Sequence, residues 1–155
     1  KQKSNWKKRL IWFIFWIYMG VMVYFLFIGE RYGSPYSEYH YNLVLFQEIR
    51  RFIVYREHVG TVNFLVNVFG NIFAFSPFGM MLPILSTHMR TWWKMLALSF
   101  LVTMCIECTQ LVTRLGVFDV DDLFMNTLGG MIGYGLYCIF RKIDNRMKRG
   151  KKNGV

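Results

Sequence analysis

Long apolar stretches divide the chain into four segments, each long enough to cross a membrane as a helix. The first, residues 10–28, contains no charged side chain. At about 1.5 Å of rise per residue, it covers the roughly 30 Å hydrocarbon core of a bilayer. The same criterion predicts three further spans at residues 62–85, 92–112 and 123–140. The pattern therefore predicts an all-α polytopic membrane protein with four transmembrane helices.

A different apolar pattern occurs between the first two spans. Leu45, Phe46, Ile49, Phe52 and Ile53 recur at spacings typical of one helix face, with Gln47, Glu48, Arg50 and Arg51 opposite. This periodicity predicts an amphipathic helix over residues 43–54 that lies in the membrane interface on the extracellular side. A lid, a contact to lipid headgroups and a simple brace are all compatible with it.

Composition supports the membrane assignment. The 155-residue chain is 54% hydrophobic and 18% charged, which is more apolar surface than a soluble domain of this length can bury. We expect one transmembrane domain over residues 1–140, whose first span is a retained anchor because it lacks a cleavage site of small residues. Residues 141–155 form a basic tail, expected to be frayed or to lie on lipid headgroups.

The distribution of charge predicts the orientation. Fourteen of the 19 lysines and arginines lie before the first span, between the second and third spans, or after the last. Eight of the nine acids lie on the opposite side. Basic residues favour the cytoplasmic side, so both termini of this multi-pass membrane protein are expected in the cytoplasm. The net charge of +10 is explained by basic residues that cluster where the spans meet the membrane surface. Nothing in the sequence therefore indicates binding to nucleic acid.

Glu107 is an ionisable residue inside the predicted third span. A charged side chain in hydrocarbon costs roughly 2.5 kcal/mol or more, and such residues commonly mark functional sites. A binding role is therefore the preferred interpretation of Glu107. The structural alternative is a salt bridge to Arg114 or to another arginine on the same side.

Other polar side chains fall at the same depth on three spans. The second carries Asn63, Asn67 and Asn71; the third carries Thr103, Glu107, Gln110 and Arg114; the fourth begins near Asp122 and Asn126. We expect these stripes to meet in one polar cavity open to the outside. For Asn63 and Thr103, a hydrogen bond between helices explains the residue equally well. For Asp119, Asp121 and Asp122, capping of a helix start is the alternative.

Small residues in the spans indicate packing. Gly129 and Gly133, four residues apart, allow two helices to approach closely, and Pro77 is expected to kink the second span. The three cysteines, Cys105, Cys108 and Cys138, are expected to be small buried residues. The sequence has no zinc-binding pattern and no glycine-rich phosphate loop.

Three blocks of residues, in this order and spacing, resemble the VanZ-like family of small bacterial membrane proteins. The blocks are N-x-x-G-N followed by FSPFG (Asn67 to Gly79), E-x-x-Q (Glu107, Gln110), and D-x-x-D-x-x-x-N-T-x-G-G (Asp119 to Gly130). The resemblance covers about residues 42–140. Two features depart from the family pattern: Ser76 replaces a common isoleucine, and Arg114 lies further from the first aspartate than the family's usual arginine.

The resemblance implies resistance to teicoplanin and related lipoglycopeptide antibiotics, with no reaction assigned to the family and no cofactor. Together with the expected cavity, it predicts binding of a membrane lipid, a lipid-linked cell-wall precursor or a drug moiety. The ligand-binding residues expected are Glu107, Gln110, Asp119, Asp122, Asn126, Asn67, Asn71 and Arg114.

Two alternatives come from other classes of protein. In a metal-dependent envelope-lipid enzyme, Glu107, Asp119 and Asp122 would hold a divalent cation such as Mg²⁺ against a lipid phosphate. In a transporter of lipid or solute, Glu107 would titrate and Pro77 would act as a hinge. The enzyme needs converging carboxylates, and the transporter needs a polar path through the bundle.

Overall fold

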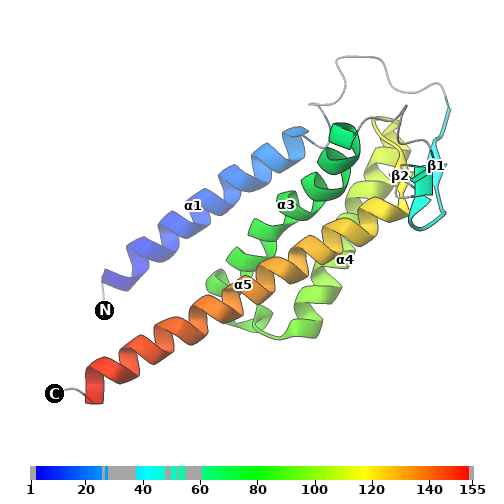
Figure 1. Ribbon diagram of the computed structural model, residues 1–155. Coiled ribbons are helices and arrows are strands. Elements are labelled where there is room, and N and C mark those ends of the chain that lie inside the picture. The colour runs from blue at the N-terminus through cyan, green and yellow to red at the C-terminus, as the bar shows by residue number, and fades with distance from the viewer. Residues whose placement is uncertain are drawn as a thin grey trace.

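Long helices dominate the structure, a computed structural model that describes residues 3–25, 27, 38–47, 50–51, 53–54 and 61–153 (Figure 1). The side chains of residues 3–5, 61, 63, 64, 67 and 151–153 also lie outside the description. The long helices are α1 (Lys3–Tyr24), α3 (Thr61–Leu85), α4 (Trp92–Thr113) and α5 (Val120–Asn153). The prediction of an all-α fold is confirmed for this part of the chain.

Three of these helices are long and apolar enough to cross a membrane. The stretches that meet this criterion are Val68–Leu85 in α3, Trp92–Thr113 in α4 and Val120–Gly150 in α5. The protein is therefore a membrane protein. The other predicted span, residues 10–28, coincides with α1 as far as Tyr24 and then runs into positions outside the described residues, so its crossing stays a prediction.

The helices lie lengthwise against one another (Figure 1). Helix α5 runs beside α3 and also contacts α4, while α1 lies along α3. Both termini lie at one end of the bundle, which also holds the short 3-10 helix η2 (Thr87–Met89) between α3 and α4. At the other end, β1 (Tyr41–Asn42) and β2 (Phe118–Asp119) pair in parallel, with Tyr41 opposite Phe118 and Asn42 opposite Asp119.

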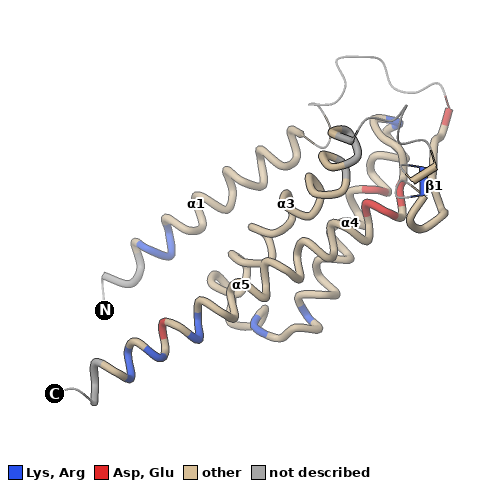
Figure 2. The backbone as a smooth tube through the Cα atoms, viewed as in Figure 1, with Lys and Arg blue, Asp and Glu red and all other residues tan. Residues whose placement is uncertain are grey.

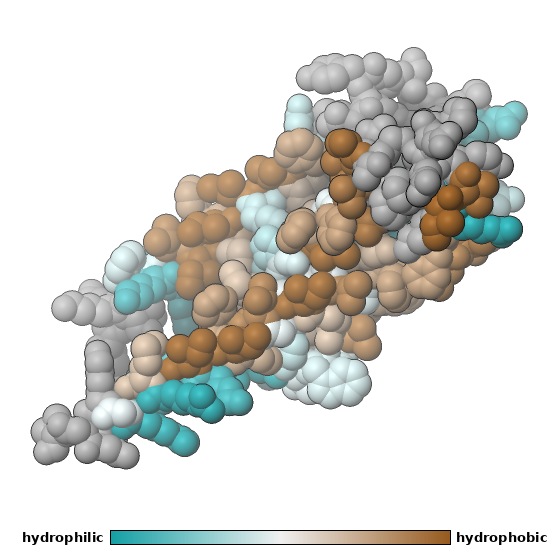
Figure 3. Space-filling view, viewed as in Figure 1, coloured by the Kyte–Doolittle hydropathy of each residue, from teal (hydrophilic) through white to brown (hydrophobic). Residues whose placement is uncertain are grey.

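Charge differs between the two ends of the bundle (Figure 2). Most of the described lysines and arginines lie at the end that carries the termini, whereas the described acids other than Asp144 lie at the β1–β2 end. Between them, apolar side chains cover the middle of the face seen in Figure 3, mainly along α1 and α5. Aromatic residues such as Trp12, Phe13 and Trp16 of α1 are also exposed, which suits a helix whose surface a bilayer covers.

Glycines bring α3 and α5 into backbone contact. A Cβ atom on Gly79 would lie 1.8 Å from the carbonyl oxygen of Gly130, and one on Gly133 would lie 1.9 Å from the carbonyl oxygen of Ser76. No side chain fits at these distances, so this crossing requires glycine at both positions. The packing interpretation of Gly129 and Gly133 agrees with this geometry, because a Cβ on Gly129 would also collide with the backbone of Ile72.

Apolar side chains fill the centre of the bundle. Phe15, Phe78, Met81 and Met95 form one buried cluster, and Met22, Phe75 and Ile106 form a second, nearer the β1–β2 end. Phe15 of α1 lies with its ring centroid 6.3 Å from that of Phe78 of α3, so aromatic contacts join these two helices. The core thus lies between the two charged ends.

Three expectations from the sequence have different outcomes. The basic tail is not frayed as far as Asn153, because α5 continues into it as one helix of 34 residues. The cysteines are exposed free thiols, so their expected burial is wrong; they lie on outward faces of α4 and α5, where lipid can surround a thiol. The amphipathic helix of residues 43–54 includes positions 48, 49 and 52, which lie outside the described residues, so it stays a prediction.

Candidate functional site

Polar side chains from three helices converge on one cavity near the β1–β2 end. Its volume is about 420 Å³, and α1 closes one side of it. The polar residues in its lining are Asn71 of α3, Glu107 and Gln110 of α4, and Asp122 and Asn126 of α5, together with Tyr18 of α1. We name this the acidic cavity, because its described lining contains two carboxylates and no lysine or arginine.

Glu107 is almost completely buried, since only 2% of its surface is exposed. Helical spacing in α4 places it above the buried Thr103 and below Gln110, on the face that packs toward α5. The backbone N–H of Asp119 donates a hydrogen bond of 3.0 Å to its Oε2 atom. The main chain just before α5 therefore holds one carboxylate oxygen in place.

Two side chains of α5 connect the cavity to the other helices. The Nδ2 atom of Asn71 donates to Oδ1 of Asp122, which links α3 to the start of α5. The Nδ2 atom of Asn126 donates a hydrogen bond of 3.0 Å to Oγ of Thr103 in α4. This is the hydrogen bond between helices that the sequence analysis gave as one of two explanations for Thr103. The fixed positions of Asp122 and Asn126 follow from these contacts.

Asn126 also presents an unsatisfied acceptor. The side chain is 1% exposed, and its Oδ1 atom has no hydrogen-bond partner among the described residues. Buried amide oxygens are nearly always paired in native proteins. Because Asn126 lines the acidic cavity, a donor group placed there would satisfy this atom.

Asp119, an expected ligand-binding residue, and Asp121 are not among the described residues that line the acidic cavity. Asp119 Oδ1 accepts hydrogen bonds from Asn42 Nδ2 at 3.0 Å and from the backbone N–H of Asp121 at 2.8 Å. Asp121 in turn accepts from the backbone N–H of Phe46. Asp119 therefore caps the start of α5, and the two carboxylates fasten residues 42–46 to the bundle.

Arg114 lies outside the lining of the acidic cavity as far as the described residues show it. It ends α4 in a left-handed conformation with φ 58°, and its guanidinium carbon lies 4.5 Å from the centroid of the Tyr39 ring. This cation–π contact joins the end of α4 to the segment before β1. The side chain of Asn67, another expected ligand-binding residue, lies outside the described residues.

Tyr18 is a lining residue that the sequence interpretation missed. Its hydroxyl donates a hydrogen bond of 2.5 Å to the carbonyl oxygen of Ala74 in α3. A tyrosine far from either end of a transmembrane stretch, where interfacial water cannot reach its hydroxyl, needs such a partner. The central position of Tyr18 within residues 10–28 could therefore have identified it from the sequence.

The floor of the cavity is apolar. Met22 belongs both to the lining and to the buried cluster with Phe75 and Ile106. Beyond it, toward the termini, lies the other buried cluster, which contains Phe78 and Met95. Within the described residues, this core separates the acidic cavity from the end that carries the termini.

The carboxylates do not form a recognisable metal site. No group of three or more His, Cys, Asp or Glu side chains in the described part of the chain is arranged to hold a metal ion. Glu107, Asp119 and Asp122 instead bond to separate partners, a backbone N–H, Asn42 and Asn71. The arrangement is suited to accepting hydrogen bonds from hydroxyl or amino groups.

Comparison with known proteins identifies the family. The chain is 28% identical over 109 residues to Protein VanZ of Enterococcus faecium, an alignment that covers 70% of this chain and 66% of that protein, just under two thirds of its length. No solved structure matches the chain. The sequence profile of the VanZ/LLP1 family matches residues 15–141, which include the lining of the acidic cavity, all of α3 and α4, and part of α1 and α5. The chain belongs to the VanZ/LLP1 family.

Proposed function

We propose that the protein protects bacteria against teicoplanin and related lipoglycopeptide antibiotics by binding a polar group in the acidic cavity. The group belongs to an envelope lipid, a lipid-linked cell-wall precursor or the drug. Membership of the VanZ/LLP1 family supports this proposal. The observation that carries it is the convergence of Asn71, Glu107, Gln110, Asp122 and Asn126 from three helices on one cavity.

The chemistry of the cavity indicates what kind of group fits. Glu107 and Asp122 supply carboxylate oxygens, and Asn126 supplies an unpaired amide oxygen. Groups that donate hydrogen bonds, such as sugar hydroxyls or amines, match these acceptors. The described lining offers a phosphate two acidic side chains and no cation, so the headgroup's hydroxyl or amino portion is the part that binds.

In the proposed orientation, the acidic cavity lies at the outer surface of the membrane. The proposed topology has both termini in the cytoplasm, because 14 of 19 basic residues lie at that end. The acidic cavity then opens at the opposite end, toward the outer leaflet. Lipoglycopeptides and lipid-linked precursors meet on that side of the membrane.

The proposal is tested with Glu107→Gln. The amide oxygen of glutamine still accepts the hydrogen bond from the Asp119 N–H, so the fold should persist while the negative charge is lost. In a teicoplanin-susceptible host, the minimal inhibitory concentration should fall to that of cells without the protein. Expression level and melting temperature in detergent should stay near wild type.

The matched control is Glu38→Gln, which removes the same charge from an exposed position. This variant should protect as well as the wild type, and chelation of divalent cations should leave protection unchanged. Full protection by Glu107→Gln would contradict the proposal. Loss of folding in Glu107→Gln would show that the carboxylate is structural, which also contradicts it.

A further inference from the structure

A second cavity lies at the opposite end of the bundle, where both termini are found. It has a volume of about 550 Å³ and lies between the end of α3, the residues after η2 and α5. Arg90 and Arg141 line it, and so does Tyr137. We name this the basic cavity.

Tyr137 supplies an observation independent of charge. Its side chain is 7% exposed, and its hydroxyl has no hydrogen-bond partner in the part of the chain that the structure describes. A buried hydroxyl without a partner is unfavourable, so native proteins rarely leave one. Because Tyr137 is one of the residues that line the basic cavity, this unpaired donor lies beside the space that an acceptor would occupy.

The two arginines reach the cavity from different elements. Arg141 follows Tyr137 by four residues on α5, so the two side chains share a helix face. Arg90 comes from the α3–α4 connection, where its Nε donates to the carbonyl oxygen of Pro83 at 3.1 Å. The hydroxyl of Tyr134 donates to the carbonyl oxygen of Arg90 at 2.7 Å, which fixes the same residue from α5. The position of Arg90 is therefore built into the fold.

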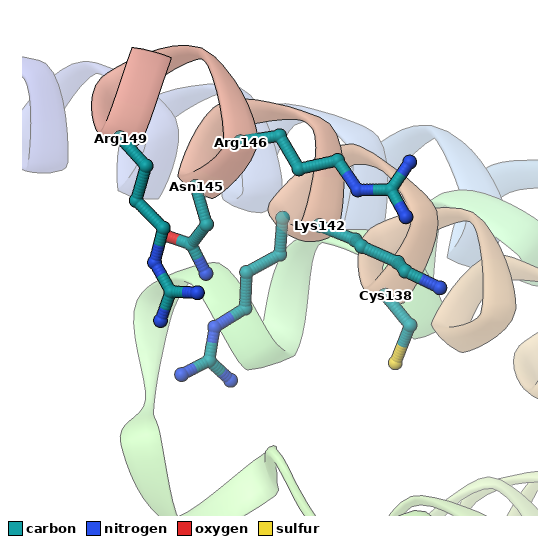
Figure 4. Close-up of a pocket in the computed structure, with 6 residues that line it drawn as sticks. Cys138, Lys142, Asn145, Arg146 and Arg149 are labelled. Atoms are coloured by element: carbon teal, nitrogen blue, oxygen red, sulfur yellow. The ribbon is translucent and has the colours of Figure 1, made fainter. Parts of the chain in front are cut away.

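An adjoining groove continues the basic surface around α5 (Figure 4). It has a volume of about 420 Å³ and shares Arg141 with the basic cavity. Figure 4 shows Lys142, Arg146 and Arg149 at successive turns of α5, with no acid among the residues that line the groove. Asp144, the acid that lines the basic cavity, forms an ion pair with Lys148, with 2.5 Å between its Oδ2 atom and the lysine Nζ atom. Positive charge therefore dominates this end.

Apolar side chains complete the basic cavity. Met80 and Ile84 of α3 and Phe140 of α5 line it together with the arginines. Ile84 and Phe140 are exposed, so this wall continues into the lipid-facing surface of the bundle. Arginines and an unpaired hydroxyl beside exposed apolar residues match a molecule with a phosphate and acyl chains.

We propose that the basic cavity binds the phosphate of an anionic phospholipid headgroup through Tyr137, Arg90 and Arg141. The hydroxyl and the guanidinium groups donate hydrogen bonds to phosphate oxygens. The acyl chains lie against Met80, Ile84 and Phe140. This site is separate from the acidic cavity, whose described lining offers a phosphate no cation.

Lipid binding is measured by native mass spectrometry on the full chain in detergent, titrated with phosphatidylglycerol, phosphatidylcholine or inorganic phosphate. The wild type should bind phosphatidylglycerol in preference to the other two. Arg90→Gln combined with Arg141→Gln should weaken this binding about tenfold or more, because two charge-assisted contacts are lost. Tyr137→Phe should weaken it about threefold to tenfold without lowering the melting temperature of the lipid-free protein.

The matched control is Lys8→Gln combined with Arg9→Gln. It removes two exposed positive charges from α1 at the same end of the bundle. This variant should bind phosphatidylglycerol within about twofold of the wild type. An equal loss in the control would indicate diffuse attraction and overturn the proposal. Unchanged binding by Tyr137→Phe, or inorganic phosphate binding as tightly as the lipid, would also overturn it.

Discussion

At the β1–β2 end of the bundle, polar side chains from α3, α4 and α5 point inward and bond to one another. At the end that carries the termini, most charged side chains project outward from α5 alone. Glu107 is 2% exposed, whereas the side chains of Lys148 and Asp144 are 71% and 52% exposed. A buried carboxylate thus occurs at the β1–β2 end, and an exposed ion pair occurs at the end that carries the termini.

The difference shows what each end requires from the fold. The acidic cavity exists only when three helices meet, because each contributes one or two of its polar groups. The basic surface needs little more than one helix and its position at the membrane boundary. The basic cavity is the exception, since Arg90 and the α3 residues complete it from outside α5.

The largest expected effect concerns which end faces outward. In a cysteine-free variant, a single cysteine at Val117, near β2, should react with a membrane-impermeant thiol reagent on intact cells. A single cysteine at Thr87, in η2, should react only after lysis. The cysteine-free protein is the control for background. Reaction of Thr87→Cys on intact cells would reverse the assignment of the two ends.

The next effect concerns the helix crossing on which the acidic cavity depends. Gly133→Ala places a methyl group against the carbonyl oxygen of Ser76, so α3 and α5 must separate. Overpacking of this kind typically costs about 1–3 kcal/mol, which should lower the melting temperature in detergent.

The matched control for this crossing is Gly135→Ala on the same helix. A Cβ at Gly135 has no neighbour within 4 Å, so alanine should leave stability unchanged or raise it, as alanine favours helices. Equal behaviour of the two variants would contradict the close approach of α3 and α5.

The smallest effects compare one polar contact from each end. Asn42→Ala removes the bonds from its Nδ2 to Asp119 and from the Val44 N–H to its Oδ1, both 3.0 Å. We expect a loss of about 1 kcal/mol and faster amide exchange at Val44 to Phe46.

Lys148→Ala is the comparison at the other end. It breaks an exposed ion pair between residues four apart on α5, and should change stability by about 0.5 kcal/mol or less. Chemical unfolding in detergent measures both variants. If Lys148→Ala destabilises the protein more than Asn42→Ala, the contrast between the two ends is wrong.

Much of the fold could be predicted from the sequence. Hydropathy located α3, α4 and α5 because a membrane helix must be apolar over a known length. Helical spacing also predicted that Asn71, Glu107 and Asp122 would meet, since side chains on one face of each helix point the same way. Both inferences depend on local periodicity.

Contacts between distant segments could not be predicted in the same way. Asn42 and Asp119 meet although 77 residues separate them, and nothing in either local pattern encodes that pairing. Arg114 was expected to bind a ligand because its spacing put it on the same face of α4 as Glu107. In the structure it ends α4, where its backbone adopts a left-handed conformation. Gly79 faces Gly130 only once the angle between α3 and α5 is set.

The length of α5 has a mechanical consequence. Its 34 residues extend about 51 Å, well beyond the roughly 30 Å of hydrocarbon. Gly133, one of the positions where α5 lies in backbone contact with α3, acts as a fulcrum that divides this rod into arms of about 20 Å toward Val120 and about 30 Å toward Asn153. A small tilt about the fulcrum therefore displaces the far tip of the rod half as much again as the end beside the acidic cavity.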